Sequence, residues 1–274
     1  VGPGGEPVIG AELILVGLPN YDPPIVARGK SGEGGRFSLD RPTALTGDHH
    51  PQRAPILWAV KPGFRASATR FPEALPRPDE PVRIVLEPPG KAEVRVEGPD
   101  GRPLSGVKVL PERLKTHHTN MPDVVADLAA ATTGPDGSAV IAAVAPDELA
   151  YIDVHSREFG IQGRPIVPKP GKPAVIALRP ASTWKGRLSA EDPKHARGWR
   201  VRAWTRVGGG PNADPQSTGY VETTTDDEGR FALAPIAVGG LQLDLKPPGD
   251  LPVLVDLPRS LAVREGREDR WTSR

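Results

Sequence analysis

Short hydrophobic runs, each ended by a turn, recur along the whole chain. In many of them apolar and polar residues alternate, as in AEVRVE at 92–97 and LQLDLK at 241–246. A period of two places successive side chains on opposite faces of a strand, so these runs predict half-buried strands. Only MPDVVADLAAATT at 121–133 has the composition of a helix. Because parallel sheets need crossover helices, the pattern predicts an all-β protein with antiparallel sheets.

One turn sequence that leads directly into a strand occurs three times. The copies are GKSGEGGRFSL at 29–39, TTGPDGSAVI at 132–141 and TTDDEGRFAL at 224–233. Their turn glycines lie 102 and 92 residues apart, at Gly35, Gly137 and Gly229. A second set of glycines, each at the start of a strand, lies 96 and 92 residues apart, at Gly10, Gly106 and Gly198. The chain is therefore predicted to contain three repeats of about 95 residues.

The acidic residues of these turns are expected to serve the turn itself. In Asp136–Gly137 and Glu228–Gly229, glycine supplies the positive φ, and a neighbouring acid can accept hydrogen bonds from backbone N–H groups. The repeats open on Gly-x-Pro-hydrophobic sequences, GEPVIGAELILV at 5–16 and GRPLSGVKVL at 101–110. The third opening, HARGWRVRAW at 195–204, keeps the glycine and the strand without Gly-x-Pro.

This order of motifs resembles the carboxypeptidase regulatory-like domain, a transthyretin-like (prealbumin-like) fold. The resemblance implies three tandem seven-stranded antiparallel β-sandwiches, Ig-like in architecture, at 1–90, 91–181 and 182–274. Val1 would fall inside the first strand of the first unit, which is then truncated. The segment 263–274 aligns with 168–180, which places the last strand of the third unit at the terminus. Val1 is not methionine, and we expect the chain to be a segment of a larger bacterial protein.

Charge and composition exclude several classes of partner. The 35 basic and 34 acidic residues are mixed along the chain, so no basic stripe for nucleic acid is present. No apolar stretch approaches the roughly 18 residues that a membrane-spanning helix needs. The chain has no cysteine, which excludes disulfides and thiolate metal sites. The 34 prolines and 31 glycines punctuate apolar runs, so they indicate ordered, turn-rich β-structure.

Candidate metal ligands occur at four places in the sequence. His155 and Glu158 form a His-x-x-Glu pair as in zinc carboxypeptidases, but they lie on a strand, where residues three apart face opposite sides. The pairs His49–His50 and His117–His118 could capture a surface metal, although their positions in the repeats are not equivalent. TTDDEGR at 224–230 lacks the spaced acids of an EF-hand loop. We therefore expect no metal, cofactor or catalytic residue.

The candidate ligand contacts lie on one strand of the third repeat. In GWRVRAW at 198–204, alternation puts Trp199 on one face with the other core-type residues. It puts Arg200, Arg202 and Trp204 on the other face, where an exposed indole could stack on a sugar ring, pair with arginine or pack on a neighbouring unit. By the same parity, Trp58 shares a face with Ile56 and Val60 and is expected in the core.

The sequence thus predicts a rod of three β-sandwiches with a mechanical or recognition function and no enzymatic activity. Its short proline-containing junctions, EPPGK at 87–91 and RPAST at 179–183, are expected to restrict the angles between units. Expected partners are neighbouring domains of the same polypeptide and a protein or glycan ligand. The resemblance alone implies an extracytoplasmic location. The alternatives are a carbohydrate-binding accessory module of an envelope enzyme and a metallopeptidase-associated domain.

Overall fold

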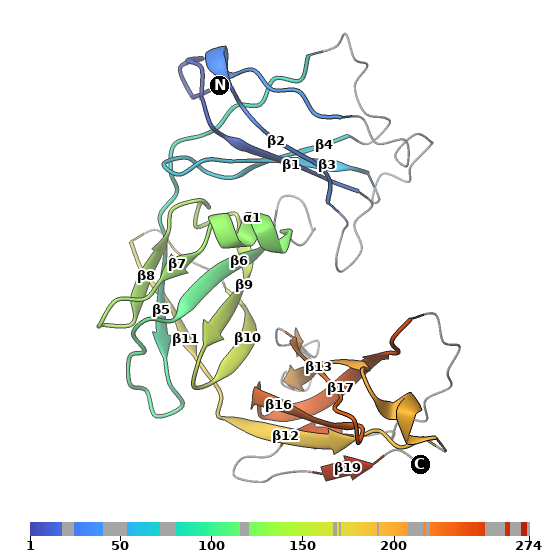
Figure 1. Ribbon diagram of the computed structural model, residues 1–274. Coiled ribbons are helices and arrows are strands. Elements are labelled where there is room, and N and C mark those ends of the chain that lie inside the picture. Colours follow the sequence, from blue (N-terminus) through green and yellow to red (C-terminus); the bar gives the residue numbers. More distant parts are fainter. Residues whose placement is uncertain are drawn as a thin grey trace.

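The protein is all-β, with its sheets arranged in three successive parts along a bent path (Figure 1). The computed structural model describes residues 1–17, 25–40, 54–71, 81–115, 121–166, 169, 171–190, 192–207, 216–217, 220–249, 261–263 and 270–272. Within these ranges the one α-helix is α1 (Asp123–Leu128), and 3-10 turns occur at η1 (Glu33–Gly35) and η4 (Pro193–Ala196). The path bends at the middle part.

The N-terminal sheet has the order β2-β1-β3-β4 and is antiparallel throughout. Its strands are β1 (Glu12–Val16), β2 (Ile25–Lys30), β3 (Ile56–Val60) and β4 (Ser67–Arg70). All five residues of β3 are buried, so this sheet is covered on both faces. One face packs on residues 82–86 and forms the N-terminal core, which contains Leu13 and Leu57. A strand covered on both sides reads as a continuous apolar run, as β1 and β3 do.

The middle sandwich consists of two facing sheets. Its strands are β5 (Ala92–Glu97), β6 (Lys108–Leu114), β7 (Ala131–Thr132), β8 (Ser138–Ile141), β9 (Leu149–Ser156), β10 (Gly160–Pro165) and β11 (Ala174–Ala177). They form the sheets β11-β5-β8 and β10-β9-β6-β7. Alternate residues of the central strands fill the space between the sheets, and Val94, Val109 and Val154 are fully buried there.

The C-terminal sandwich also has two sheets. Its strands are β12 (Ala181–Arg187), β13 (Arg200–Val207), β14 (Gln216–Ser217), β15 (Val221–Thr224), β16 (Arg230–Ala237), β17 (Gly239–Lys246), β18 (Leu261–Val263) and β19 (Arg270–Thr272). One sheet has the order β16-β12-β19, and the other has the order β14-β13-β17-β18 with β15 also paired to β13. Trp184 and Phe231 pack between them with ring centroids 5.7 Å apart.

Two strand pairs are parallel, contrary to the expectation of purely antiparallel sheets. β11 pairs with β5, and β19 pairs with β12, in each case joining the first and last strands of a sandwich. The rest of the sandwich forms the connection between these strands, so no crossover helix is needed. At the N-terminus, the Val1 ammonium donates to the Ile84 carbonyl, and the Leu86 N–H donates to the Val1 carbonyl, both at 2.8 Å. The first and last segments of the N-terminal part therefore also lie side by side, as the first and last strands of the two sandwiches do.

A buried hydroxyl makes the same contacts in each of the three parts. In the third, Thr225 Oγ1 accepts from the Trp199 N–H at 2.9 Å and donates to the Ala196 carbonyl at 2.7 Å. Thr133 and Ser31 make the equivalent pairs of bonds in the other two parts. All three residues are 4–5% exposed. Each hydroxyl thus fixes the start of one strand to the strand that precedes the repeated turn, and we call it the hydroxyl clamp.

The repeated turn also has one geometry in all three copies. In the second copy, the Gly137 N–H donates to the Gly134 carbonyl, and the Gly134 N–H donates to the Ser138 carbonyl, both at 2.9 Å. Gly137 has φ +78°, and a Cβ there would lie 2.6 Å from the Val96 oxygen. The turn therefore needs glycine for its conformation and for the close approach of β5. The prediction of a triplicated turn is confirmed.

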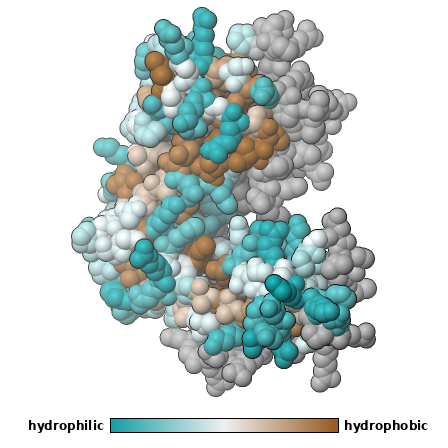
Figure 2. All heavy atoms as spheres, viewed as in Figure 1, coloured by the Kyte–Doolittle hydropathy of each residue, from teal (hydrophilic) through white to brown (hydrophobic). Residues whose placement is uncertain are grey.

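An apolar interface joins the N-terminal sheet to the middle sandwich. The second face of the sheet, which carries Ile14, Ile56 and Trp58, belongs to the same buried cluster as the core of the middle sandwich. Helix α1 contacts β3 and β6 and adds Val125 to this cluster. Figure 1 shows α1 between the two parts, and Figure 2 shows hydrophobic side chains gathered where they meet. Trp58 is buried as predicted, but the core that it enters is this interface.

Polar contacts fix the same interface at its edge. The Ala66 N–H after the turn that follows β3 donates to the Ala143 carbonyl of the middle sandwich at 2.8 Å. Arg65 forms an ion pair with Glu148 at 3.5 Å. In the first junction, a Cβ on Gly90 would lie 2.0 Å from the Val144 oxygen. The junction is therefore packed against the middle sandwich, so packing restricts the angle in addition to proline stiffness.

The second junction is held by a buried glutamine. Gln162 on β10 is fully buried, and its side-chain amide donates to the Arg179 carbonyl at 2.9 Å and accepts from the Arg179 N–H at 3.0 Å. Two residues further on, β12 of the C-terminal sandwich begins. Strand β10 also contacts β16, where a Cβ on Gly160 would lie 2.3 Å from the Pro235 oxygen. The middle and C-terminal sandwiches therefore meet without an intervening linker.

Candidate ligand-binding face

The His-x-x-Glu pair does not form a zinc site. Glu158 lies in the turn after β9, where its carboxylate accepts two hydrogen bonds from Arg102 at 2.6 and 2.8 Å. His155 lies on β9 opposite Lys108. Burial and the Lys108 charge lower the pKa of His155. A zinc site would also need a distant histidine, and His195 is the one that follows this pair in the sequence. It lies in η4 of the C-terminal sandwich, where its backbone carbonyl accepts from Trp199 Nε1. The two side chains of the motif thus have separate environments.

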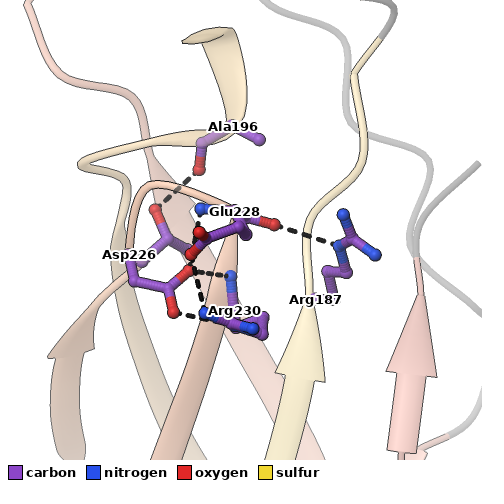
Figure 3. A network of polar contacts seen from close by, with 6 residues as sticks. Arg187, Ala196, Asp226, Glu228 and Arg230 are labelled. Atoms are coloured by element: carbon purple, nitrogen blue, oxygen red, sulfur yellow. Dashed lines mark hydrogen bonds and ion pairs between the residues drawn. The ribbon is translucent and has the colours of Figure 1, made fainter. Parts of the chain in front are cut away.

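The acids of TTDDEGR stabilise their own turn (Figure 3). Asp226 Oδ1 accepts from the Glu228 and Arg230 N–H groups at 3.0 and 2.8 Å, and its Oδ2 accepts from Arg230 Nε at 2.9 Å. Arg230 also contacts Glu228, at 2.7 Å, and Arg187 donates to the Glu228 carbonyl at 3.0 Å. The hydrogen bond from the Arg230 side chain, with the backbone bonds, lowers the pKa of Asp226. The interpretation of this sequence as turn chemistry is supported by these bonds.

Other candidate metal ligands can be placed only in part. His49–His50 and His117–His118 lie outside the described residues. Across the part of the chain that is described, no three or more His, Cys, Asp or Glu side chains come together as a metal site would require.

Two buried carboxyl groups in the middle sandwich were missed by the sequence analysis. Burial and the neighbouring Asp153 raise the pKa of Glu112 to about 8, and burial and Asp123 raise the pKa of Asp153 to about 6. Glu112 is the extra residue of a β-bulge in β6, and its carbonyl accepts from the Met121 N–H at 2.5 Å just before α1. The bulge at Glu112 interrupts the alternation of β6, and sequence parity does not reveal the packing of α1 on this strand.

The sequence-predicted parity of β13 is confirmed. Trp199 and Val201 are buried in the C-terminal core, together with Ala203. Arg200 is exposed, and Arg202 and Trp204 are half-buried on the opposite side of the sheet. The structure therefore brings the three candidate residues together on one outward face.

Neighbouring strands complete this face with residues that sequence parity alone did not identify. The register pairs Arg202 with Glu222 of β15 and with Asp244 of β17, and pairs Trp204 with Gln242 of β17. On the other side of β13, Tyr220 immediately precedes β15, and the Arg202 guanidinium lies over its ring. We call the set the β13 face; it consists of Arg200, Arg202, Trp204, Tyr220, Glu222, Thr224, Gln242, Asp244 and Lys246.

Hydrogen bonds and stacking fix the aromatic side chains of the β13 face. Trp204 Nε1 donates to Gln242 Oε1 at 2.6 Å. The Arg202 guanidinium lies 4.2 Å from the centroid of the Tyr220 ring, and its Nε contacts Glu222 Oε2 at 3.1 Å. The arginine that could have paired with the Trp204 indole therefore stacks on the Tyr220 ring instead. The face therefore presents aromatic rings, carboxylates and cations next to one another.

Comparisons with known proteins give only distant similarity. No family model matches the chain, and no curated protein matches it. Among solved structures, a streptococcal ancillary pilin is 13% identical with a TM-score of 0.27, and the match covers 80% of this chain and 75% of the pilin. The minor pilin of Streptococcus agalactiae is 14% identical with a TM-score of 0.28, and the match covers 66% of this chain and 93% of the pilin. The major pilin subunit of Bacillus cereus is 11% identical with a TM-score of 0.25, and the match covers 99% of this chain and 96% of the pilin. Similarity at these TM-scores carries no argument about this chain.

A search of the described residues for membrane-spanning helices found none of sufficient length and hydrophobicity.

Proposed function

We propose that this chain is a stiff, non-catalytic spacer and interaction segment of a larger envelope or secreted bacterial protein. It consists of three units of the carboxypeptidase regulatory-like type, at 1–90, 91–181 and 182–274. The three hydroxyl clamps and three equivalent turns support the triplication. Its partners are the neighbouring domains of the polypeptide, and its location is extracytoplasmic. The positions of His155 and Glu158 do not favour the metallopeptidase-associated alternative.

The observation that carries this proposal is the apolar interface between the N-terminal sheet and the middle sandwich. Three whole residues of β3, Ile56, Trp58 and Val60, belong to a cluster shared with the next unit. Burying one such side chain contributes about 1.5–3 kcal/mol to the stability of the interface. The two units are therefore held in one orientation. A spacer transmits position and force only if successive units cannot pivot freely. A chain of independently packed units joined by linkers would lack this interface.

Distance measurements between spin labels test the stiffness. The chain has no cysteine, so pairs of introduced cysteines label only the chosen sites. Ile9 and Val175 are 57% and 61% exposed, and Ala232 is also exposed. The pairs Ile9→Cys/Val175→Cys and Val175→Cys/Ala232→Cys report on the two junctions. We expect one narrow distance distribution for each pair. Broad distributions like those of a control chain with a Gly/Ser insertion at the first junction would overturn the proposal.

A further inference from the structure

Two aromatic side chains of the described residues, Trp204 and Tyr220, lie on the outward side of the C-terminal sandwich and outside its core cluster. Trp58, Trp184 and Trp199 are at most 4% exposed. Trp204, by contrast, is half-buried, and Tyr220 is 41% exposed and is the aromatic residue among the exposed large hydrophobic side chains of the described ranges. Both contact the same strand region, because Arg202, two residues before Trp204 on β13, lies over the Tyr220 ring. Exposed aromatic rings grouped on a surface mark binding sites more often than isolated ones do.

Both rings are held before any ligand arrives. Gln242 fixes the indole through its N–H, and the Arg202 guanidinium, which is itself bound to Glu222, covers one side of the Tyr220 ring. Side chains that are already ordered lose little conformational freedom on binding, so more of the contact energy appears as affinity. Trp204 also stands on the central strand β13, which positions it more rigidly than a loop would.

The charge of the β13 face selects the chemistry of its ligand. Arg200, Arg202 and Lys246 are balanced in part by Glu222 and Asp244: Arg202 lies between the two acids in one cross-strand row, and Arg200 and Lys246 share the next row. A polyanion such as nucleic acid is bound by a surface of one sign, and this face does not provide one. Alternating donors and acceptors around an aromatic ring instead match a neutral polyhydroxylated ligand, whose hydroxyl groups both donate and accept.

We propose that the β13 face binds a neutral saccharide chain, with a pyranose ring stacked on Trp204. The axial C–H groups of the sugar contact the indole face, and its hydroxyl groups exchange hydrogen bonds with the exposed carboxylate of Asp244 and the guanidinium of Arg200. Asp244 lies on β17 in the cross-strand row next to that of Trp204, and Arg200 lies four residues before Trp204 on β13, so both polar groups lie to one side of the ring along the strand. This proposal goes beyond the spacer function and does not depend on it, since the face belongs to one sandwich alone.

The test is binding to defined neutral oligosaccharides. Cellohexaose, xylohexaose, mannohexaose and hexa-N-acetylchitohexaose are titrated by calorimetry into the full chain, with polygalacturonate as the acidic comparison. We expect one of the neutral chains to bind. Trp204→Ala should weaken this binding at least about tenfold, because stacking on an aromatic ring supplies most of the contact. Trp204→Tyr should restore part of the affinity, and Val175→Ala, on another exposed face, should leave it unchanged.

Three results would overturn the proposal. The first is that no neutral oligosaccharide of this panel binds. The second is that binding occurs and Trp204→Ala, shown by its thermal unfolding to be folded, does not weaken it. The third is that only polygalacturonate binds and that added salt abolishes its binding, which would identify an anion site. Spin-label distances at the two junctions stay narrow in each of these cases, so failure here is distinguishable from failure of the spacer proposal.

Discussion

Trp58→Ala should uncouple the N-terminal sheet from the middle sandwich. The side chain is fully buried on β3, and it faces the cluster shared with the middle sandwich and helix α1. Replacing a buried tryptophan by alanine usually costs about 3–5 kcal/mol, from lost transfer energy and from the cavity that remains. The upper half of this range applies if the rigid sheets on either side cannot close the cavity. Because Trp58 contributes to a cluster that both units share, the loss of stability should affect both of them.

A matched variant separates this effect from ordinary core damage. Leu57 is the preceding residue of the same strand, is 4% exposed and belongs to the N-terminal core on the other face. Leu57→Ala should cost a comparable 2–5 kcal/mol. It removes no contact with the middle sandwich, so its effect should remain in the N-terminal sheet.

Amide hydrogen exchange on the two variants distinguishes the outcomes. Trp58→Ala should speed exchange both in β3 and in α1, and it should broaden the distance distribution between labels at positions 9 and 175. Leu57→Ala should speed exchange in β1 and β3 while α1 keeps its protection. If α1 exchanges at the wild-type rate in Trp58→Ala, the interface does not couple the two units and the reasoning is wrong.

Three further predictions concern a proton, a hydroxyl and a glycine. The raised pKa of Glu112, about 8 against its usual 4.5, means that the folded state keeps a proton which the unfolded state releases, so stability should fall between these pH values. In urea unfolding measured from pH 4.5 to 8, the free energy of unfolding of the wild type should fall by up to about 1.4 kcal/mol per pH unit because of this group. Glu112→Gln should remove this contribution. Thr225→Val leaves two buried backbone groups unpaired and should cost about 1–3 kcal/mol by urea unfolding, whereas exposed Thr224→Val should be near neutral. Gly160→Ala should separate the middle and C-terminal sandwiches and broaden the label distance across that junction. Gly171 has a similar positive φ, but a Cβ added there would have no neighbour within 4 Å. Gly171→Ala should therefore lower stability without changing the label distance.

The features predictable from the sequence are those set by local spacing. The alternation in β13 was sufficient to separate Trp199 from Trp204, because successive residues of a strand face opposite sides whatever surrounds the sheet. The repeated turn was predictable because glycine is required where the chain takes a positive φ. The helix at 121–133 was also predicted, although it ends at Leu128 and residues 131–132 pair as β7.

The features that could not be predicted depend on contacts between distant segments. Nothing local to ILWAV indicates that Trp58 faces another unit, because a strand buried on both sides reads the same whether its cover comes from its own unit or from the next. The burial of Glu112 depends on a helix that packs above its strand. Gln242 joined the candidate face only through the register of β17, and a shift of one residue would have turned it inward. Tyr220 joined it through its contact with Arg202.

The side-by-side arrangement of the first and last strands has a mechanical consequence. Because β5 and β11 run in the same direction, the chain enters the sandwich at one end of this pair and leaves at the other. Tension along the polypeptide then slides the two strands past each other and loads all their backbone hydrogen bonds together. An antiparallel pair at the same place would open one bond at a time from its end. The same geometry at β12 and β19 extends this resistance to stretching to the C-terminal sandwich.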